Sequence, residues 1–357
     1  MKFRQTEAGS IQYSVGNSAI IFCASINNKL YSVKCYTAHS ERLKTIYGTQ
    51  LLEQELYIPS DNASGVWLDV LLTDWIEGDT LGNRIKELVQ AKDIQQLTLL
   101  SENFDRLALE LLQNQRAHGD ITCENIIVDR DNNLHLIDFD GSFTPELAGE
   151  QSIELGTQAY QHPRRTSKMF NSSIDDYSLA IISTALAVTA LEPEIYNQFW
   201  DTDGLLYTPL EMVEGRSKAL ETTMICFAQK GKPFAYAIAK MLTSLSPELP
   251  NLAKIVRLKS EGVDPNAAPT SIFYDQGAWG YLNEFGRETI PPIFGSAISF
   301  RESRAAVKFG ESWHYIDNQC RVVINCHGYD RLKSFHDGCG RAQKDGEWVE
   351  VNENIPI

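Results

Sequence analysis

The segment His118-Gly119-Asp120-Ile121-Thr122-Cys123-Glu124-Asn125 is followed, 13 residues after Asn125, by Asp138-Phe139-Asp140. Between the two segments, the apolar runs 126–128 and 134–137 are joined by the turn-forming residues 129–133, which predicts a β-hairpin. Before them, apolar residues at helical spacing predict an amphipathic helix over 97–116. We therefore expect Asp120 and Asn125 in a tight loop between a helix and a hairpin, and Asp138 at the end of a strand.

The predicted elements change along the chain from strands to helices. Residues 11–36 are expected to form a hairpin of two strands, 40–57 a helix, and 66–76 a further strand. The run 177–191 is apolar nearly all round, which is typical of a helix buried on every side. Further helices are expected over 217–229, 234–245 and 252–261. This order indicates an α+β protein with a small β-rich beginning and a mostly helical continuation.

The central loop and the strand end carry groups that suit phosphoryl transfer. A carboxylate can accept the proton of an attacking hydroxyl, and oxygen ligands can hold Mg²⁺ against the phosphates of a nucleotide. The spacing of Asp120, Asn125 and Asp138 resembles the catalytic loop and the metal-binding D-F-G segment of protein kinases. The resemblance implies that Asp120 is a catalytic base, that Asn125 and Asp138 are metal ligands, and that ATP and Mg²⁺ (or Mn²⁺) are cofactors.

Other parts of the kinase pattern occur in the same order. Residues 31–34 are similar to the V-A-I-K strand, so the resemblance gives catalytic roles to Lys34 and to Glu53, its ion-pair partner on the following helix. Residues 72–78 look like the hinge that receives adenine, and residues 156–163 look like the end of an activation segment. The nucleotide-binding residues implied by the resemblance are Val15, Gly16, Lys34, Thr73, Asp74 and Ile76. Asp175 would anchor the catalytic loop.

The resemblance covers about residues 10–260 and implies a bilobal protein-kinase-like fold. A small β-rich N-lobe over residues 1–75 and a mostly helical C-lobe over 76–262 would form this catalytic domain. Residues 263–276 shift in composition to proline, asparagine and alanine, which indicates a linker. A separate small domain over residues 277–357 would follow.

The C-terminal residues repeat themselves. Trp279, Trp313 and Trp348 are spaced by 34 and 35 residues, and the aromatic, β-prone segments around Trp279 and Trp313 match one another. Each unit is too short to bury its own apolar face, so stacked small sheets are expected. The segments resemble WG repeats, and the resemblance implies a small all-β domain that binds an unknown protein partner.

Several departures from the kinase pattern leave the function open. Gly16 alone remains of the G-x-G-x-x-G loop, Gly119 replaces the arginine of H-R-D, and Thr122 takes the place of a lysine. Asp140 replaces the D-F-G glycine, either as a second metal ligand or as a solvated or hydrogen-bonding residue. A bacterial, eukaryotic-like Ser/Thr protein kinase is favoured by residues 156–163. The alternatives are a sugar or antibiotic kinase and a nucleotide-binding pseudokinase scaffold.

Composition restricts partners and compartment. The net charge of -15 argues against nucleic acid or an anionic membrane as a partner, because either would repel an acidic surface. No apolar run is long enough to cross a bilayer and no leader pattern is present, so a cytoplasmic protein is expected. Seven cysteines at irregular spacing fit reduced, buried thiols better than a disulfide framework.

Overall fold

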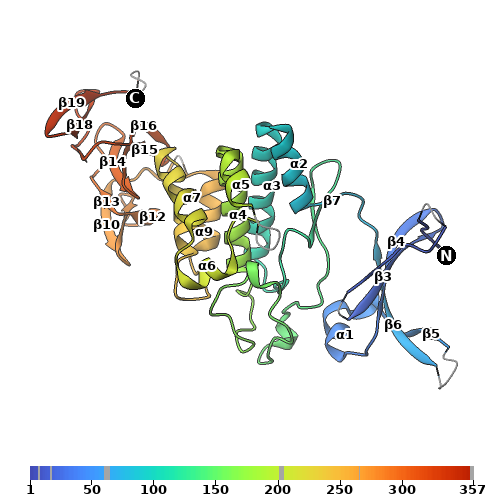
Figure 1. Cartoon of the computed structure of the whole chain (residues 1–357). Coiled ribbons are helices and arrows are strands. Elements are labelled where there is room, and N and C mark those ends of the chain that lie inside the picture. Colours follow the sequence, from blue (N-terminus) through green and yellow to red (C-terminus); the bar gives the residue numbers. More distant parts are fainter. Residues whose placement is uncertain (7–8, 17, 60–64, 201–204, 265, 354–357) are drawn as a thin grey trace.

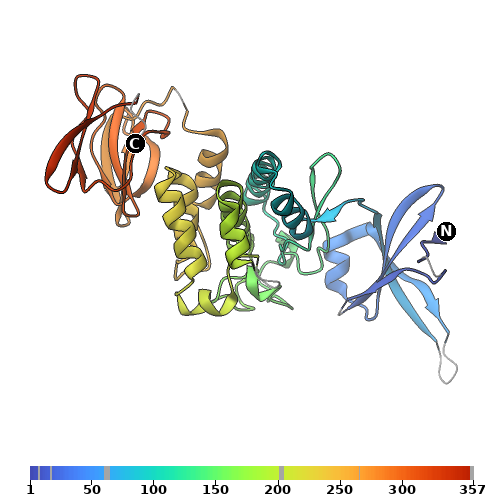
Figure 2. The ribbon, with the colours of Figure 1, turned by 45° about the horizontal axis from the view of Figure 1, so that its top comes forward.

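The computed structural model describes residues 1–6, 9–16, 18–59, 65–200, 205–264 and 266–353. The molecule is elongated and consists of three parts in chain order (Figures 1 and 2). We call them the sheet part (residues 1–74), the helical part (residues 75–262) and the repeat part (residues 271–351). Within the described residues, no helix has both the length and the apolar composition needed to span a membrane.

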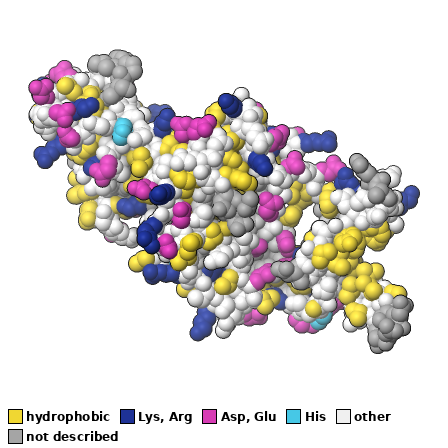
Figure 3. All heavy atoms as spheres, in the orientation of Figure 1, with side chains coloured by type: hydrophobic (Ala, Val, Ile, Leu, Met, Phe, Trp, Pro, Cys, Tyr) yellow, Lys and Arg dark blue, Asp and Glu magenta, His cyan; other side chains and the backbone are white. Residues whose placement is uncertain are grey.

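The sheet part is an antiparallel sheet in the order β1-β3-β4-β6-β5, with β2 also paired to β3. The strands are β1 (Lys2–Phe3), β2 (Tyr13–Val15), β3 (Ala19–Ile26), β4 (Lys29–Tyr36), β5 (Leu51–Ile58) and β6 (Val66–Asp74). Asn27 and Asn28 both have positive φ, as a tight two-residue hairpin between β3 and β4 requires. Hydrophobic side chains gather over this part of the surface in Figure 3. The exposed large hydrophobic residues of the sheet part include Tyr57 and Trp67.

The expected helix over residues 40–57 is wrong in its second half. Helix α1 (Glu41–Tyr47) ends at Gly48, whose positive φ favours glycine, and one 3-10 turn (Gly48–Gln50) leads into β5. Leu51 is paired with Leu71 of β6 and is buried there. The apolar residues that suggested a longer helix therefore begin an edge strand of the sheet.

The helical part is built around one buried helix. Helix α4 (Asp176–Leu191) is enclosed nearly all round, as its uniformly apolar sequence predicts, and α3 (Ile94–Leu112) packs along it. Asp93 caps α3 and Ser217 caps α7 (Lys218–Gln229), each by accepting a backbone N–H bond, which fixes where these helices start. The other helices are α2 (Leu81–Ala91), α5 (Pro193–Phe199), α6 (Pro209–Glu214), α8 (Pro233–Met241) and α9 (Leu252–Glu261). Strands β7 (Asp79–Thr80), β8 (Ile126–Val128) and β9 (Leu134–Leu136) form a small sheet beside α2, so the predicted hairpin after α3 is confirmed.

The repeat part contains three small antiparallel sheets, β10-β11-β12, β13-β14-β15-β16 and β17-β18-β19. Their bounds are β10 (Ser271–Asp275), β11 (Ala278–Leu282), β12 (Glu288–Phe294), β13 (Ser296–Ala297), β14 (Arg304–Phe309), β15 (Ser312–Asp317), β16 (Val322–Cys326), β17 (Arg331–Leu332), β18 (Gly340–Lys344) and β19 (Glu347–Val351). The predicted linker over 263–276 is too long. Tyr274 in β10 pairs with Trp279 in β11, so the first sheet already begins at Ser271.

The repeat part shares a continuous apolar core with the helical part. The Tyr236 ring of α8 lies 5.6 Å from the Phe309 ring of β14. Asn325 of β16 donates a hydrogen bond of 2.6 Å to the backbone carbonyl of Gln229. A methyl group added to Gly310 would lie 3.1 Å from the side chain of Ala228, which shows how closely the two parts approach. The repeats therefore rest directly on α7 and α8.

A buried histidine at this junction predicts a pH dependence of stability. His314 of β15 is fully buried and stacks on Phe309 with ring centroids 4.5 Å apart. Neither ring nitrogen makes a hydrogen bond of normal geometry among the described residues, although the Ala228 backbone lies beside the ring. Burial, with a smaller effect from His327, lowers the pKa of His314 to about 4.

In the unfolded chain, His314 has a pKa of about 6.5, so unfolding takes up a proton between these two values. His314 therefore contributes a loss of stability of about 2 kcal/mol as the pH falls from neutrality toward 5. Asp176, whose pKa is raised to about 7 by burial, contributes in the opposite direction over the same range. Urea unfolding of the wild type, His314→Gln and the exposed control His336→Gln measures the contribution of His314. As the pH falls from 7 to 5, the stability of His314→Gln should change by about 2 kcal/mol less in the destabilising direction than that of the wild type. The same pH dependence in wild type and His314→Gln would contradict the prediction.

Candidate active site

Lys34 of β4 lies between two carboxylates of the D-F-D segment. Its Nζ atom is 2.7 Å from Asp138 Oδ1 and 2.7 Å from Asp140 Oδ2. The Lys34 side chain is buried, Asp140 is nearly so, and Asp138 is 44% exposed. Desolvation opposes the charged form of Lys34, but attraction to the two aspartates outweighs it and raises the pKa. The site therefore holds a charged lysine and leaves one carboxylate open to solvent.

Asp140 accepts two further hydrogen bonds, which the sequence alone did not indicate. The hydroxyl groups of Tyr36 and Tyr47 donate to Asp140 Oδ1 at 2.7 and 2.6 Å. Burial, followed by the negative charge of Asp140, raises the pKa of both phenols, so both remain donors. The contribution of Tyr36 could be predicted, because Lys34 and Tyr36 are two residues apart on a strand and so point to the same face. The contribution of Tyr47 could not, because helix α1 brings this residue to the site.

Asp120 and Asn125 are brought together by the loop that follows α3. The Asn125 amide donates to the backbone carbonyl of Asp120 at 2.9 Å and to its carboxylate at 3.2 Å. The backbone N–H of Thr157 donates to the other Asp120 oxygen at 2.6 Å. Because Asn125 donates through its nitrogen, its side-chain oxygen is available as a ligand. Asp120 is thus oriented on both oxygens.

The loop is anchored to the start of α4. Both oxygens of the buried Asp175 accept backbone N–H bonds, one from His118 and one from Gly119 at 2.8 Å. Gly119 has a φ of +88°, and a Cβ atom there would lie 2.3 Å from the Gly141 carbonyl oxygen. Arginine cannot occupy this position without moving the D-F-D segment. His118 donates a hydrogen bond of 2.9 Å through Nε2 to the Ile137 carbonyl and packs against Phe139, which links the loop to the same segment.

The expected ion pair between Lys34 and Glu53 is wrong. Glu53 lies on strand β5 rather than on a helix, and its carboxylate pairs with Lys44 of α1 at 2.8 Å. Helix α1 ends too early to carry Glu53, and the edge strand leaves this side chain exposed. Lys34 is paired with Asp138 and Asp140 instead. Glu53 therefore does not contact the group of residues around Lys34.

The residues implied for nucleotide binding lie on several elements. Thr73 of β6 pairs with Ser32 of β4, and Asp74 at the end of β6 binds Lys29 with its side chain at 2.6 Å. Ile76 is half-buried in the connection to β7. Val15 ends β2 and is exposed, whereas the Gly16 N–H donates to the Ala19 carbonyl at 2.9 Å. The Gly16 N–H is therefore already used within the turn.

The comparisons with known proteins identify the C-terminal part. The family model described as WG containing repeat matches residues 279–313 and 315–348. These segments correspond to β11–β14 and β15–β19, so the predicted WG repeats are confirmed. A comparison with curated proteins gives no match.

The seven cysteines are free thiols and six of them are buried, as expected from their spacing.

Proposed function

We propose that residues 1–262 form a bilobal, protein-kinase-like domain that transfers the γ-phosphoryl group of ATP to a Ser or Thr hydroxyl of a protein. The observation that carries this proposal is the group of Lys34, Asp138 and Asp140, which lies beside a loop that orients Asp120 and Asn125. Lys34 comes from β4, far in the sequence from the two neighbouring segments that carry the other four residues. Phosphoryl transfer depends mainly on positioning and charge stabilisation, which such a group supplies.

Each residue has a role that follows from its contacts. Asp120, held by Asn125 and the Thr157 N–H, would accept the proton of the attacking hydroxyl. Lys34 would bind the phosphates. The exposed carboxylate of Asp138 and the side-chain oxygen of Asn125 suit Mg²⁺, which when bound would neutralise charge on the phosphates. Asp140 would have the role that the resemblance implied for Glu53, which is to hold the Lys34 ammonium group in the site by an ion pair.

A protein substrate is favoured by contacts between the catalytic loop and residues 156–163. Gln161 donates to the Gly119 carbonyl at 3.4 Å, and Thr157 bonds Asp120, so this segment borders the proposed base. The small-molecule alternative rests on Gly119 and Thr122. The Thr122 hydroxyl accepts the N–H groups of Glu124 and Asn125, so it stabilises the loop. The pseudokinase alternative rests on the use of the Gly16 N–H within its own turn.

The repeat part is proposed to recruit a protein partner, because Tyr274, Phe285 and Trp348 are exposed aromatic residues. Within its described residues, 271–351, no lysine is held between carboxylates as Lys34 is. We propose that this acidic protein is cytoplasmic and has no nucleic-acid or membrane partner.

Incubation of the full chain with γ-labelled ATP and Mg²⁺ or Mn²⁺ tests the proposal. Generic proteins and a panel of sugars and aminoglycosides serve as acceptors. Label on protein supports a protein kinase, and label only on small molecules supports the sugar or antibiotic kinase. ATP binding without transfer to any acceptor would instead indicate the pseudokinase scaffold.

Asp140→Asn is expected to lower turnover about 10-fold or more, because an amide holds the Lys34 ammonium less strongly than a carboxylate does. Tyr47→Phe removes one hydrogen bond to the same carboxylate and should have a smaller effect in the same direction. Tyr57→Phe, on exposed β5, is the matched control. Steady-state rates at saturating and limiting ATP measure the effects. Full activity of Asp140→Asn would show that Asp140 does not position Lys34.

A further inference from the structure

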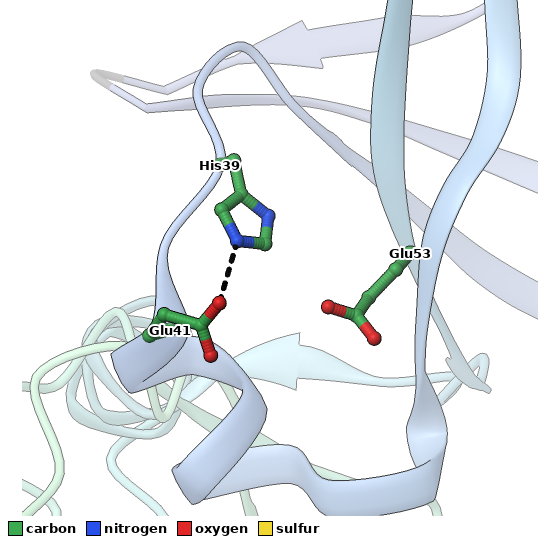
Figure 4. A group of neighbouring side chains, drawn as sticks. All are labelled: His39, Glu41 and Glu53. Atoms are coloured by element: carbon green, nitrogen blue, oxygen red, sulfur yellow. Dashed lines mark hydrogen bonds and ion pairs between the residues drawn. The ribbon is translucent and has the colours of Figure 1, made fainter.

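Three side chains of the sheet part converge on one exposed space away from Lys34. The ligand atoms of His39, Glu41 and Glu53 all lie within 4.8 Å of one another. They come from the loop after β4, from the first residue of α1 and from β5, and Figure 4 shows their polar ends facing the same gap. All three are exposed, so a small ion can reach them without opening the fold.

A buried carboxylate fixes the orientation of the histidine ring. Asp69 of β6 is 3% exposed, and its Oδ2 atom lies 2.7 Å from His39 Nδ1. Its other oxygen accepts the backbone N–H of Gln54 at 2.9 Å. Gln54 has a positive φ and lies where the pairing of β5 with β6 shifts register. An ionised carboxylate only accepts hydrogen bonds, so Nδ1 carries the ring hydrogen. The Nε2 lone pair of neutral His39 then points into the gap.

The distances in the gap suit a metal ion. His39 Nε2 lies 3.2 Å from Glu41 Oε1. Without metal, a proton on Nε2 that is donated to Glu41 accounts for this contact, so a bound metal ion would take the place of that proton. Two ligands at about 2.0–2.1 Å from a tetrahedral ion are about 3.3 Å apart, which matches this pair. Glu53 completes the set by a rotation of its exposed side chain, in which it would exchange its bond with Lys44 for the ion.

We propose that His39, Glu41 and Glu53 bind one divalent transition-metal ion of the zinc class, with solvent at the remaining position. Asp69 is the positioning residue, in the carboxylate–histidine arrangement that is common behind metal-ligating imidazoles. The imidazole nitrogen favours Zn²⁺ over Mg²⁺, which prefers oxygen ligands. Bound metal would join the start of α1 to β5. This proposal does not depend on the proposed phosphoryl transfer.

A second group of the same composition lacks these features and provides the comparison. In the repeat part, Glu302, His336 and Asp337 also lie close together. Both oxygens of Glu302 already accept backbone N–H bonds, from Asp337 at 3.0 Å and Gly338 at 2.9 Å. Among the described residues, no buried carboxylate contacts the ring of His336. We therefore expect this group to bind metal weakly or not at all.

Calorimetric titration of chelator-treated full chain with ZnCl₂, in excess Mg²⁺ and at mildly alkaline pH, tests the proposal. The wild type should bind one ion at this site and show a higher melting temperature with Zn²⁺. Glu53→Gln should lose this site, Asp69→Asn should weaken it about 10–100-fold, and His336→Gln should leave it unchanged. Circular dichroism of each variant checks that it is folded. No binding by the wild type, or equal binding by folded Glu53→Gln, would overturn the proposal.

Discussion

Asp138→Asn is expected to lower phosphoryl transfer by at least about 10²-fold while the protein stays folded. The proposed site depends on the Asp138 carboxylate both as a metal ligand and as a partner of Lys34. Folding depends on it much less, because the side chain is 44% exposed and Lys34 keeps its bond to Asp140. Residue 138 also has a φ of +66°, a conformation that asparagine tolerates as well as aspartate.

Asp131→Asn is the matched control for this experiment. It makes the same chemical change at an exposed position in the turn between β8 and β9. Initial rates with Mg²⁺ and labelled ATP, together with melting temperatures, separate an effect on chemistry from one on folding. If Asp138→Asn turns over at the wild-type rate, Asp138 is not a metal ligand. If it unfolds while Asp131→Asn does not, the D-F-D segment supports the fold.

The sequence predicted the elements around the central loop well, because their signals are local. An apolar helix, a turn-rich hairpin and the spacing of Asp120 and Asn125 each depend on neighbouring residues only. The placement of Glu53 failed for a physical reason: the leucines at 51 and 52 satisfy both a helical stripe and the start of a strand. Pairing with β6, which decides between the two, is a tertiary contact.

The three side chains that donate to Asp140 show the same limit of prediction from sequence. Lys34 and Tyr36 share a strand face, so their convergence was open to prediction, but the third donor is Tyr47. The position of Tyr47 depends on where α1 ends and on how this helix packs against the helical part. Figures 1 and 2 show α1 on the side of the sheet that faces the helices. No spacing in the sequence encodes that contact. The proximity of the proposed metal ligands His39, Glu41 and Glu53 could not be predicted from the sequence for the same reason.

Removal of residues 264–357 is expected to destabilise the helical part rather than release it as an independent domain. The repeats cover apolar surface on α7 and α8, including Ala228 and the ring of Tyr236. Exposure of this surface should cost about 2–4 kcal/mol, since a large buried side chain contributes about 1.5–3 kcal/mol. The truncated chain should melt at a clearly lower temperature or aggregate, and any loss of turnover should follow that loss of folding.

A point substitution separates contact at the junction from loss of the whole repeat part. Gly310→Ala places a methyl group 3.1 Å from Ala228, at a residue with positive φ. Gly346 also has a positive φ, of +85° against +55° at Gly310, but no atom lies within 4 Å of its added methyl group. If the junction supports the fold, Gly310→Ala should lower the melting temperature of the full chain more than Gly346→Ala does. Equal effects, together with a truncated chain as stable as the full one, would mean that the repeats only rest on the helices and are free to serve binding alone.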